Sequence, residues 1–121
     1  MSNPSNAGSA WVYLDEARAI EQIGDVATLR SMLPMLQELL ARDVPEIARL
    51  LQAQDVRGAN PLLHSLKGCM PIFCRASLCE HLARVEHLSK GGSAAEVTPA
   101  FEELRPQLDG LLAEVIRYQG L

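Results

Sequence analysis

The chain has 121 residues and a mass of 13.2 kDa, a length that suits one domain with a modest hydrophobic core. Hydrophobic residues make up 48% of it and aromatic residues only 4%, an aliphatic balance that favours packed helices over a β-sandwich. The formal net charge of −4, without a cluster of Lys and Arg, argues against a nucleic-acid-binding surface.

Composition also constrains the compartment. No apolar run approaches the length of a membrane span, so no membrane insertion is expected, and the first residues lack the apolar segment of a signal peptide. The three cysteines are an odd number in a chain without a secretory signal, which favours reduced thiols. We therefore expect a cytoplasmic protein.

The first residues of the chain divide into a tail and a short helix. Residues 1–11 are mostly small and polar and offer little to bury, so we expect a flexible tail there and a folded domain at 12–121. Apolar residues spaced three or four apart predict a short helix at 14–23, and Gly24 is suited to end it.

A long helix is predicted next, at 25–54, with Asp25 as its N-cap. Its many leucines recur at helical spacing. Pro34 and Pro45 lie inside this span, and each removes a backbone hydrogen bond and clashes with the carbonyl group four residues earlier. We therefore expect kinks in this helix, or a break near 43–45.

Three further helices complete the predicted fold. Gly91 and Gly92 should end the third long helix, and Ser93 with Glu96 resembles a capping box before the last one. No stretch alternates as a strand would. The sequence thus predicts an all-α fold, an antiparallel up-down four-helix bundle with the short additional helix at its N-terminal end. The four long helices are expected at residues 25–54, 57–70, 75–90 and 98–119.

The second long helix carries the candidate site. Asn60 suits an N-cap and Pro61 the first helical position, where a missing N–H costs nothing. His64, Lys67 and Gly68 fall together on the side opposite the apolar stripe, so we expect them to face water. A glycine inside a helix costs about 0.5–1 kcal/mol relative to alanine, so this glycine should have a compensating use.

Geometry indicates what that use is. Helical side chains lean toward the N-terminus, so a glycine at position 68 leaves the space over the His64 imidazole empty for an incoming group. Lys67 brings a mobile positive charge near the ring, which favours neutral imidazole and would stabilise an anion bound to it. Neutral imidazole is a nucleophile. The sequence therefore indicates His64 as a phosphoryl acceptor, Lys67 as a phosphoryl-stabilising residue and Gly68 as the source of steric clearance.

The segment from His64 to Gly68 reads His-Ser-Leu-Lys-Gly and matches the H-x-L-K-G motif of histidine-containing phosphotransfer (HPt) domains, which the chain resembles over roughly residues 14–118. The resemblance implies a phosphoryl carrier of a two-component multistep phosphorelay, not an enzyme. His64 would accept the phosphoryl group on Nε2 from a receiver-domain aspartate and pass it to, or back from, another receiver aspartate.

The resemblance also implies the partners of the chain. These would be receiver domains of response regulators, among them the receiver domain of a hybrid sensor histidine kinase. Mg²⁺ would be held by the receiver partner, so the resemblance implies no cofactor and no metal site in this chain. A monomer is the usual form of the family.

The chain departs from the family pattern just after the motif. Cys69 stands where a small residue such as Ser is usual, and Cys74 stands where a Gly commonly closes the helix, while Pro71 should end or bend it. With Cys79 they form a C-x4-C-x4-C spacing that lacks the C-x2-C pairs of structural zinc sites, so we interpret all three as small apolar core residues.

Two other classes of function are alternatives to the phosphoryl carrier. One is a non-phosphorylated helical adaptor that binds a receiver or kinase domain as an interaction module. The intact set of His64, Lys67 and Gly68 speaks against it, because an adaptor does not need the histidine. The other class is a thiol- or metal-based sensor that uses the three cysteines.

Overall fold

The computed structural model describes residues 11–121, and the predicted tail lies outside the described residues except for Trp11. The described chain is helical, with no strand beyond one isolated bridge between Leu14 and Cys74. The all-α prediction is therefore confirmed. The helices are α2 (Glu16–Ile23), α3 (Val26–Gln52), α4 (Val56–Cys69), α5 (Ala76–Ser89) and α6 (Ala94–Gln119), with a 3₁₀ turn, η1 (Met70–Ile72), between α4 and α5.

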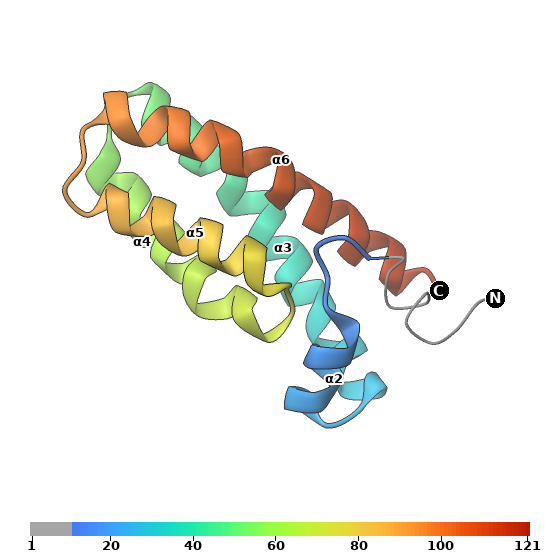
Figure 1. The fold of residues 1–121 in the computed structure, drawn as a ribbon. Helices are drawn as coiled ribbons and strands as arrows, with labels where there is room; N and C mark the ends of the chain where they lie inside the picture. Colours follow the sequence, from blue (N-terminus) through green and yellow to red (C-terminus); the bar gives the residue numbers. More distant parts are fainter. Residues whose placement is uncertain (1–10) are drawn as a thin grey trace.

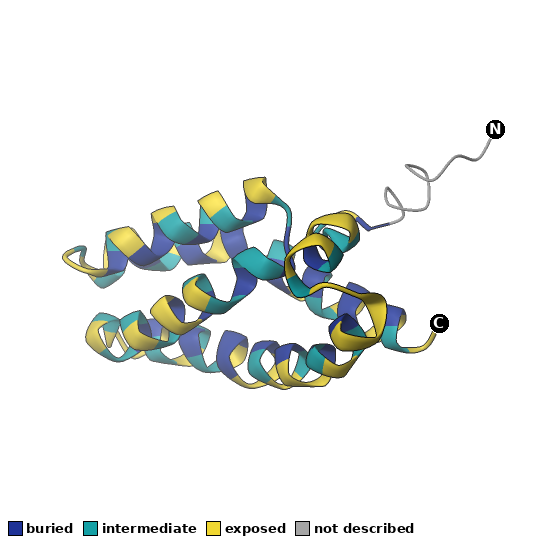
Figure 2. Cartoon of the chain, turned by 90° about the horizontal axis from the view of Figure 1, so that it is seen from below, coloured by how far each residue is buried: buried dark blue, intermediate teal, exposed yellow. Residues whose placement is uncertain are grey.

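The four long helices lie side by side, and the short helix α2 lies at one end of the group (Figure 1). α3 contacts α4 and α6, and α5 contacts the same two helices, so each long helix packs against two others. α2 contacts α3 and the turn η1. Figure 2 shows the buried parts of the helices turned toward the inside of this group and the exposed parts turned outward.

The core consists mainly of aliphatic side chains that recur at helical spacing on one side of each helix. Burying a leucine, valine or isoleucine side chain contributes about 1.5–3 kcal/mol, so these stripes decide which side of each helix faces inward. The two longest stripes come from α3 (Leu29, Leu33, Leu36, Leu40, Val44, Ile47, Leu51) and α6 (Val97, Phe101, Leu104, Leu108, Leu111, Val115, Tyr118).

Of the two outcomes expected for this helix, kinks or a break near 43–45, the break is wrong, because α3 continues as one helix through Pro34 and Pro45. Both prolines lie on the exposed side of the helix, where water can satisfy the carbonyl groups that they leave without a donor. The stripe residues before and after each proline are buried. Their burial outweighs the cost of about 3 kcal/mol for each internal proline.

The starts of α4 and α6 also differ from the prediction. α4 begins after Asp55, whose side chain accepts a hydrogen bond from the Gly58 N–H at 2.8 Å, so Asn60 lies inside the helix and is not its N-cap. α6 begins at Ala94 and not at residue 98, because the predicted capping box of Ser93 and Glu96 is formed there. Its first turn then brings another apolar side chain into the core.

The segment before α2, residues 11–15, is not helical, but it belongs to the folded domain. Trp11, the last residue of the predicted tail, is only 8% exposed. The carboxylate of Glu114 on α6 accepts hydrogen bonds from the backbone N–H groups of Val12, Tyr13 and Leu14, at 2.7, 3.0 and 2.9 Å. Helix α2 therefore begins after Asp15, not at residue 14, because the preceding backbone is bound to α6 and to Cys74.

Candidate functional site

His64 lies on the outward side of α4. The opposite side carries Ala59, Leu63 and Leu66, which are fully buried, and this stripe fixes the orientation of the helix. The His64 side chain is 68% exposed and the Lys67 side chain 39% exposed. His64 therefore faces water, as the periodicity of the sequence predicts, and Lys67 lies at the border between water and α5.

Gly68 occupies open space beside them. A Cβ atom at this position would meet no other atom within 4 Å, so neither close helix packing nor a special backbone angle requires glycine there. Gly68 follows His64 by about one turn on the same side of α4. The approach to the imidazole from this direction is therefore free of side-chain atoms.

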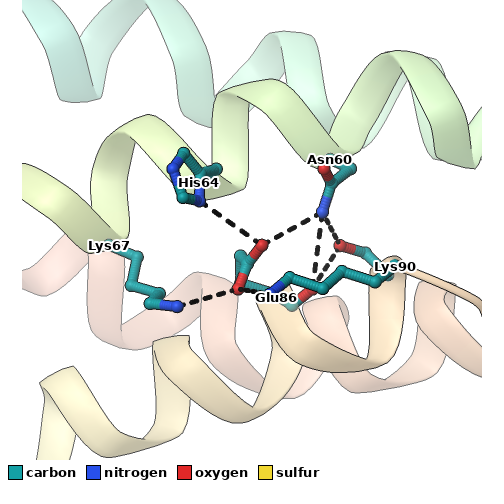
Figure 3. Close-up of polar contacts among 6 residues, drawn as sticks. Asn60, His64, Lys67, Glu86 and Lys90 are labelled. Atoms are coloured by element: carbon teal, nitrogen blue, oxygen red, sulfur yellow. Dashed lines mark hydrogen bonds and ion pairs between the residues drawn. The ribbon is translucent and has the colours of Figure 1, made fainter.

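The sequence analysis missed Glu86 of α5, which lies opposite His64 and has 0% of its side chain exposed (Figure 3). One carboxylate oxygen, Oε2, lies 3.6 Å from His64 Nδ1. The other, Oε1, lies 3.1 Å from Lys67 Nζ and accepts its hydrogen bond. A single buried carboxylate therefore lies close to both His64 and Lys67. The sequence analysis assigned these two residues to the site from their spacing along the helix and from the motif, without a partner on another helix.

Further polar side chains hold the Glu86 carboxylate in place. The Asn60 amide donates a hydrogen bond to Glu86 Oε2 at 3.2 Å and another to Ser89 Oγ at 2.7 Å. Ser89 in turn donates to the backbone carbonyl of Glu86 at 2.6 Å, and Lys90 Nζ lies 3.8 Å from Glu86 Oε1. These contacts fix the carboxylate from several directions, and they explain why Asn60 is of use inside α4.

Glu86 is ionised at neutral pH although it is buried. Desolvation by burial raises its pKa, but hydrogen bonds from Lys67 and Asn60 and the positive charges of Lys67 and Lys90 outweigh burial and hold the pKa below its ordinary value. A negative charge that faces Nδ1 of His64 favours a proton on that nitrogen. In that tautomer of the neutral imidazole the lone pair is on Nε2.

A signal for Glu86 was present in the sequence. Helical spacing in this part of the sequence places the apolar residues Leu78, Leu82, Val85 and Leu88 on one side, and Glu86 follows Leu82 by four residues on the same side. In the structure Glu86 is buried, whereas Leu88 is only half-buried. A charged residue at an apolar stripe position indicates that oppositely charged side chains lie nearby, because a buried carboxylate needs such partners.

A shallow groove of about 380 Å³ runs between α3 and α4, next to the His64 side of α4. Two of its lining residues, Ser65 and Cys69, directly follow His64 and Gly68 in the chain. The α3 side of the groove is formed by Met35, Glu38, Leu39 and Arg42, and Met35 is 55% exposed. The groove therefore offers an accessible, partly apolar surface beside the histidine.

The three cysteines do not share one environment. Cys74 is buried, as predicted for a core residue, whereas Cys69 and Cys79 are half-buried. Within residues 11–121, no group of three or more His, Cys, Asp or Glu side chains lies close enough together to hold a metal ion. In the same part of the chain, no helix has both the length and the hydropathy needed to cross a membrane.

Comparison of the chain with protein-family models, with curated proteins and with solved structures finds no match.

Proposed function

We propose that the protein is a histidine phosphotransfer protein, in which His64 accepts a phosphoryl group from the aspartyl phosphate of a receiver domain and passes it to, or back from, another receiver aspartate. In this proposal the four long helices form an antiparallel up-down bundle that holds α4 rigidly. One observation carries the proposal. An exposed histidine has Nδ1 turned toward the buried carboxylate of Glu86, and beside it Gly68 leaves the approach to the ring open.

In the proposed reaction Nε2 of His64 attacks phosphorus while the bond between phosphorus and the aspartate oxygen breaks and the aspartate leaves as a carboxylate. The imidazole gains positive charge as the N–P bond forms, and the Glu86 carboxylate beside Nδ1 offsets this charge. Lys67 is partly exposed beside His64, and in this proposal its ammonium group contacts the phosphoryl oxygens. Such transfers depend on alignment and charge neutralisation more than on covalent help from the protein.

The partner would complete the site. A receiver domain would supply both the aspartate and the Mg²⁺ that neutralises the phosphoryl oxygens, while this chain supplies the nucleophile and a docking surface. The groove between α3 and α4 is the surface that we assign to docking, because it adjoins His64 and exposes apolar atoms of Met35. No membrane and no nucleic acid takes part in this proposal, and the chain acts as a monomer in the cytoplasm.

The test is transfer of labelled phosphate from a phosphorylated receiver domain, in the presence of Mg²⁺, to the wild-type protein and to His64→Gln. We expect the wild type to take up a label that acid removes and alkali does not, as for phosphohistidine, and His64→Gln to take up none. His87→Gln is the matched control, because His87 is an exposed histidine on α5. It should be labelled like the wild type.

Lys67→Ala should weaken transfer or retention of the label without abolishing it, because the lysine supplies charge but no covalent bond.

The competing function is the adaptor that binds receivers without accepting phosphate. A folded wild-type protein that binds several receivers and never takes label would replace the proposed function with that one. Labelling of His64→Gln at the wild-type level would place the acceptor on another residue.

A further inference from the structure

Cys74 and Cys79 lie on either side of the start of α5. Cys74 precedes the helix and is fully buried, and Cys79 lies in the first turns of the helix and is half-buried. The Sγ atom of Cys79 lies 3.8 Å from the backbone carbonyl oxygen of Cys74, within contact of sulfur and oxygen. The start of α5 therefore turns the second cysteine back onto the first.

The turn that carries Cys74 is held in place on both sides. The Asp15 N–H donates to the Phe73 carbonyl oxygen at 2.8 Å, and the Arg75 N–H donates to the Tyr13 carbonyl oxygen at 2.9 Å. These two hydrogen bonds lie on either side of Cys74 and tie the backbone there to the segment before α2. The backbone of Cys74 is therefore fixed beside Cys79 and is not part of a loose loop.

The two thiols differ in reactivity. The pKa of Cys79 is lowered to about 7, chiefly by a hydrogen bond from the Cys74 thiol and further by the charge of Arg18. Desolvation by burial and the charge of Glu80 act in the opposite direction but are outweighed. The same hydrogen bond, together with burial, raises the pKa of Cys74. Cys79 is thus the more accessible and the more acidic thiol of the pair and Cys74 its buried neighbour, the arrangement of a reactive cysteine beside a resolving one.

We propose that Cys74 and Cys79 form a thiol pair that hydrogen peroxide oxidises to an intramolecular disulfide. The Cys79 thiolate attacks one peroxide oxygen, the O–O bond breaks, and the hydroxide that leaves takes up a proton to give water and a sulfenic acid on Cys79. Sulfur of Cys74 then attacks sulfur of Cys79, and the displaced hydroxide leaves as water with the Cys74 proton. Two thiols lose two electrons in total, and the peroxide is reduced to two water molecules.

Cys69 provides the contrast within the same chain. It is half-buried like Cys79, but burial raises its pKa, and it lies in the groove between α3 and α4. Its thiol is therefore a weaker nucleophile at neutral pH. We expect Cys69 to stay reduced while the pair at the start of α5 is oxidised. The oxidation site is independent of the proposed phosphoryl transfer, which does not use any cysteine.

The test is oxidation of the whole folded protein with a small excess of hydrogen peroxide, followed by alkylation of the remaining thiols and digestion with trypsin. Cleavage after Lys67, Arg75 and Arg84 separates the two cysteines of the pair into the peptides 68–75 and 76–84. We expect mass spectrometry to find these peptides cross-linked, with Cys69 alkylated. Alkylation of all three cysteines after peroxide treatment would overturn the proposal.

Two variants distinguish the pair from other disulfides that join the same peptides. Cys69→Ser should keep the cross-link, because Cys74 and Cys79 are intact, and loss of the cross-link in this variant would assign the disulfide to Cys69 and overturn the proposal. Cys79→Ser changes a half-buried residue and should leave the fold intact. It should give no cross-link and lose its thiols to peroxide much more slowly than the wild type. An unchanged rate of thiol loss would show that Cys79 is not the reactive cysteine.

Discussion

Glu86 carries a negative charge with no exposed side-chain surface, at a place where a lone carboxylate would cost several kcal/mol to bury. Asn60, Lys67 and Lys90 remove that cost, because together they supply two hydrogen bonds and two positive charges to the carboxylate. The same carboxylate lies next to His64 Nδ1. At the scale of single residues, the charge that stabilises the packing of α4 on α5 therefore also faces the imidazole.

Glu86→Gln should lower the free energy of unfolding by about 1–3 kcal/mol at neutral pH, because glutamine keeps the shape but loses the charge that Lys67 and Lys90 face. The folded-state pKa of Glu86 is lower than the ordinary value of 4.5. The ionised carboxylate therefore contributes its full stabilisation of the folded state at pH values above 4.5, and this contribution is lost as the pH falls through the folded-state pKa. Urea unfolding of both proteins from about pH 7 to about pH 3 measures whether the difference shrinks with acid.

The control for this prediction is Glu80→Gln, at an exposed glutamate of the same helix. We expect the free energy of unfolding of this variant to stay within about 0.5 kcal/mol of the wild type across the pH range. A difference between the wild type and Glu86→Gln that grows on acidification would contradict the direction of the Glu86 pKa.

Two glycines in helices should respond in opposite ways to alanine. Gly68→Ala should raise the free energy of unfolding by about 0.5–1 kcal/mol, because the new Cβ meets no atom within 4 Å and the helix gains a better helix former. Gly110→Ala on α6 should lower it, because its Cβ would contact the ring of Tyr13 too closely. Urea unfolding of the two variants measures both effects.

The steric role of Gly68 is tested by Gly68→Gln. We expect this variant to be folded, for the same reason as Gly68→Ala, but to accept phosphate from a phosphorylated receiver more slowly, because the longer side chain leans over His64. Gly91→Gln is the matched control, since a Cβ at Gly91 also meets no atom within 4 Å. Transfer to Gly68→Gln at the wild-type rate would mean that the glycine does not serve to clear the approach.

At the scale of elements, the non-helical segment before α2 is held by side chains that are distant in the sequence. Three consecutive backbone N–H groups donate to Glu114 of α6, and the Arg75 guanidinium donates to the Trp11 carbonyl oxygen at 2.9 Å. The Trp11 ring lies 5.5 Å from the ring of Tyr118, between centroids. The segment thus joins the C-terminal half of α6 to the turn between α4 and α5.

Glu114→Gln should release this segment. A glutamine offers one acceptor oxygen to three N–H donors and places its own N–H₂ group against them, so we expect a loss of about 1.5–3 kcal/mol in the free energy of unfolding. The fluorescence of Trp11, the single tryptophan, should shift to longer wavelength as the ring meets water. Glu103→Gln, an exposed position on α6, is the control. Unchanged emission in Glu114→Gln would show that the carboxylate does not hold the segment.

The elements that periodicity predicts and those that it misses differ for a physical reason. The spacing of leucines predicts the inward sides of the long helices, because burial of those side chains depends only on the helix that carries them. Periodicity does not predict that α3 passes through Pro45, since the cost of the proline is offset by partners on other helices. Glu86 and Glu114 were missed likewise, and Asn60 was wrongly assigned as an N-cap, because each acts through a residue on another element.

At the scale of the whole molecule, exposed apolar side chains lie on more than one side of the bundle. Met35 of α3 is 55% exposed in the groove beside α4, and Ile116 of α6 is 49% exposed. Single exposed apolar residues are normal on a protein surface. Of these two residues, only Met35 adjoins the side of α4 that carries His64. The proposed function therefore predicts that a substitution by glutamate affects phosphoryl transfer at Met35 and not at Ile116.

Met35→Glu should slow phosphoryl transfer from a phosphorylated receiver by at least about tenfold, equivalent to about 1.4 kcal/mol, because it places a charge that loses water when the partner docks. Ile116→Glu makes a similar change at a similarly exposed residue of α6 and should leave the transfer rate unchanged. Both variants should unfold at the urea concentration of the wild type, since neither residue is buried. Equal transfer rates for the two variants would exclude the groove between α3 and α4 as the docking surface. Slower transfer in Ile116→Glu alone would place docking on the α6 side of the bundle, away from His64. That result would be incompatible with the attack of His64 Nε2 on a bound receiver.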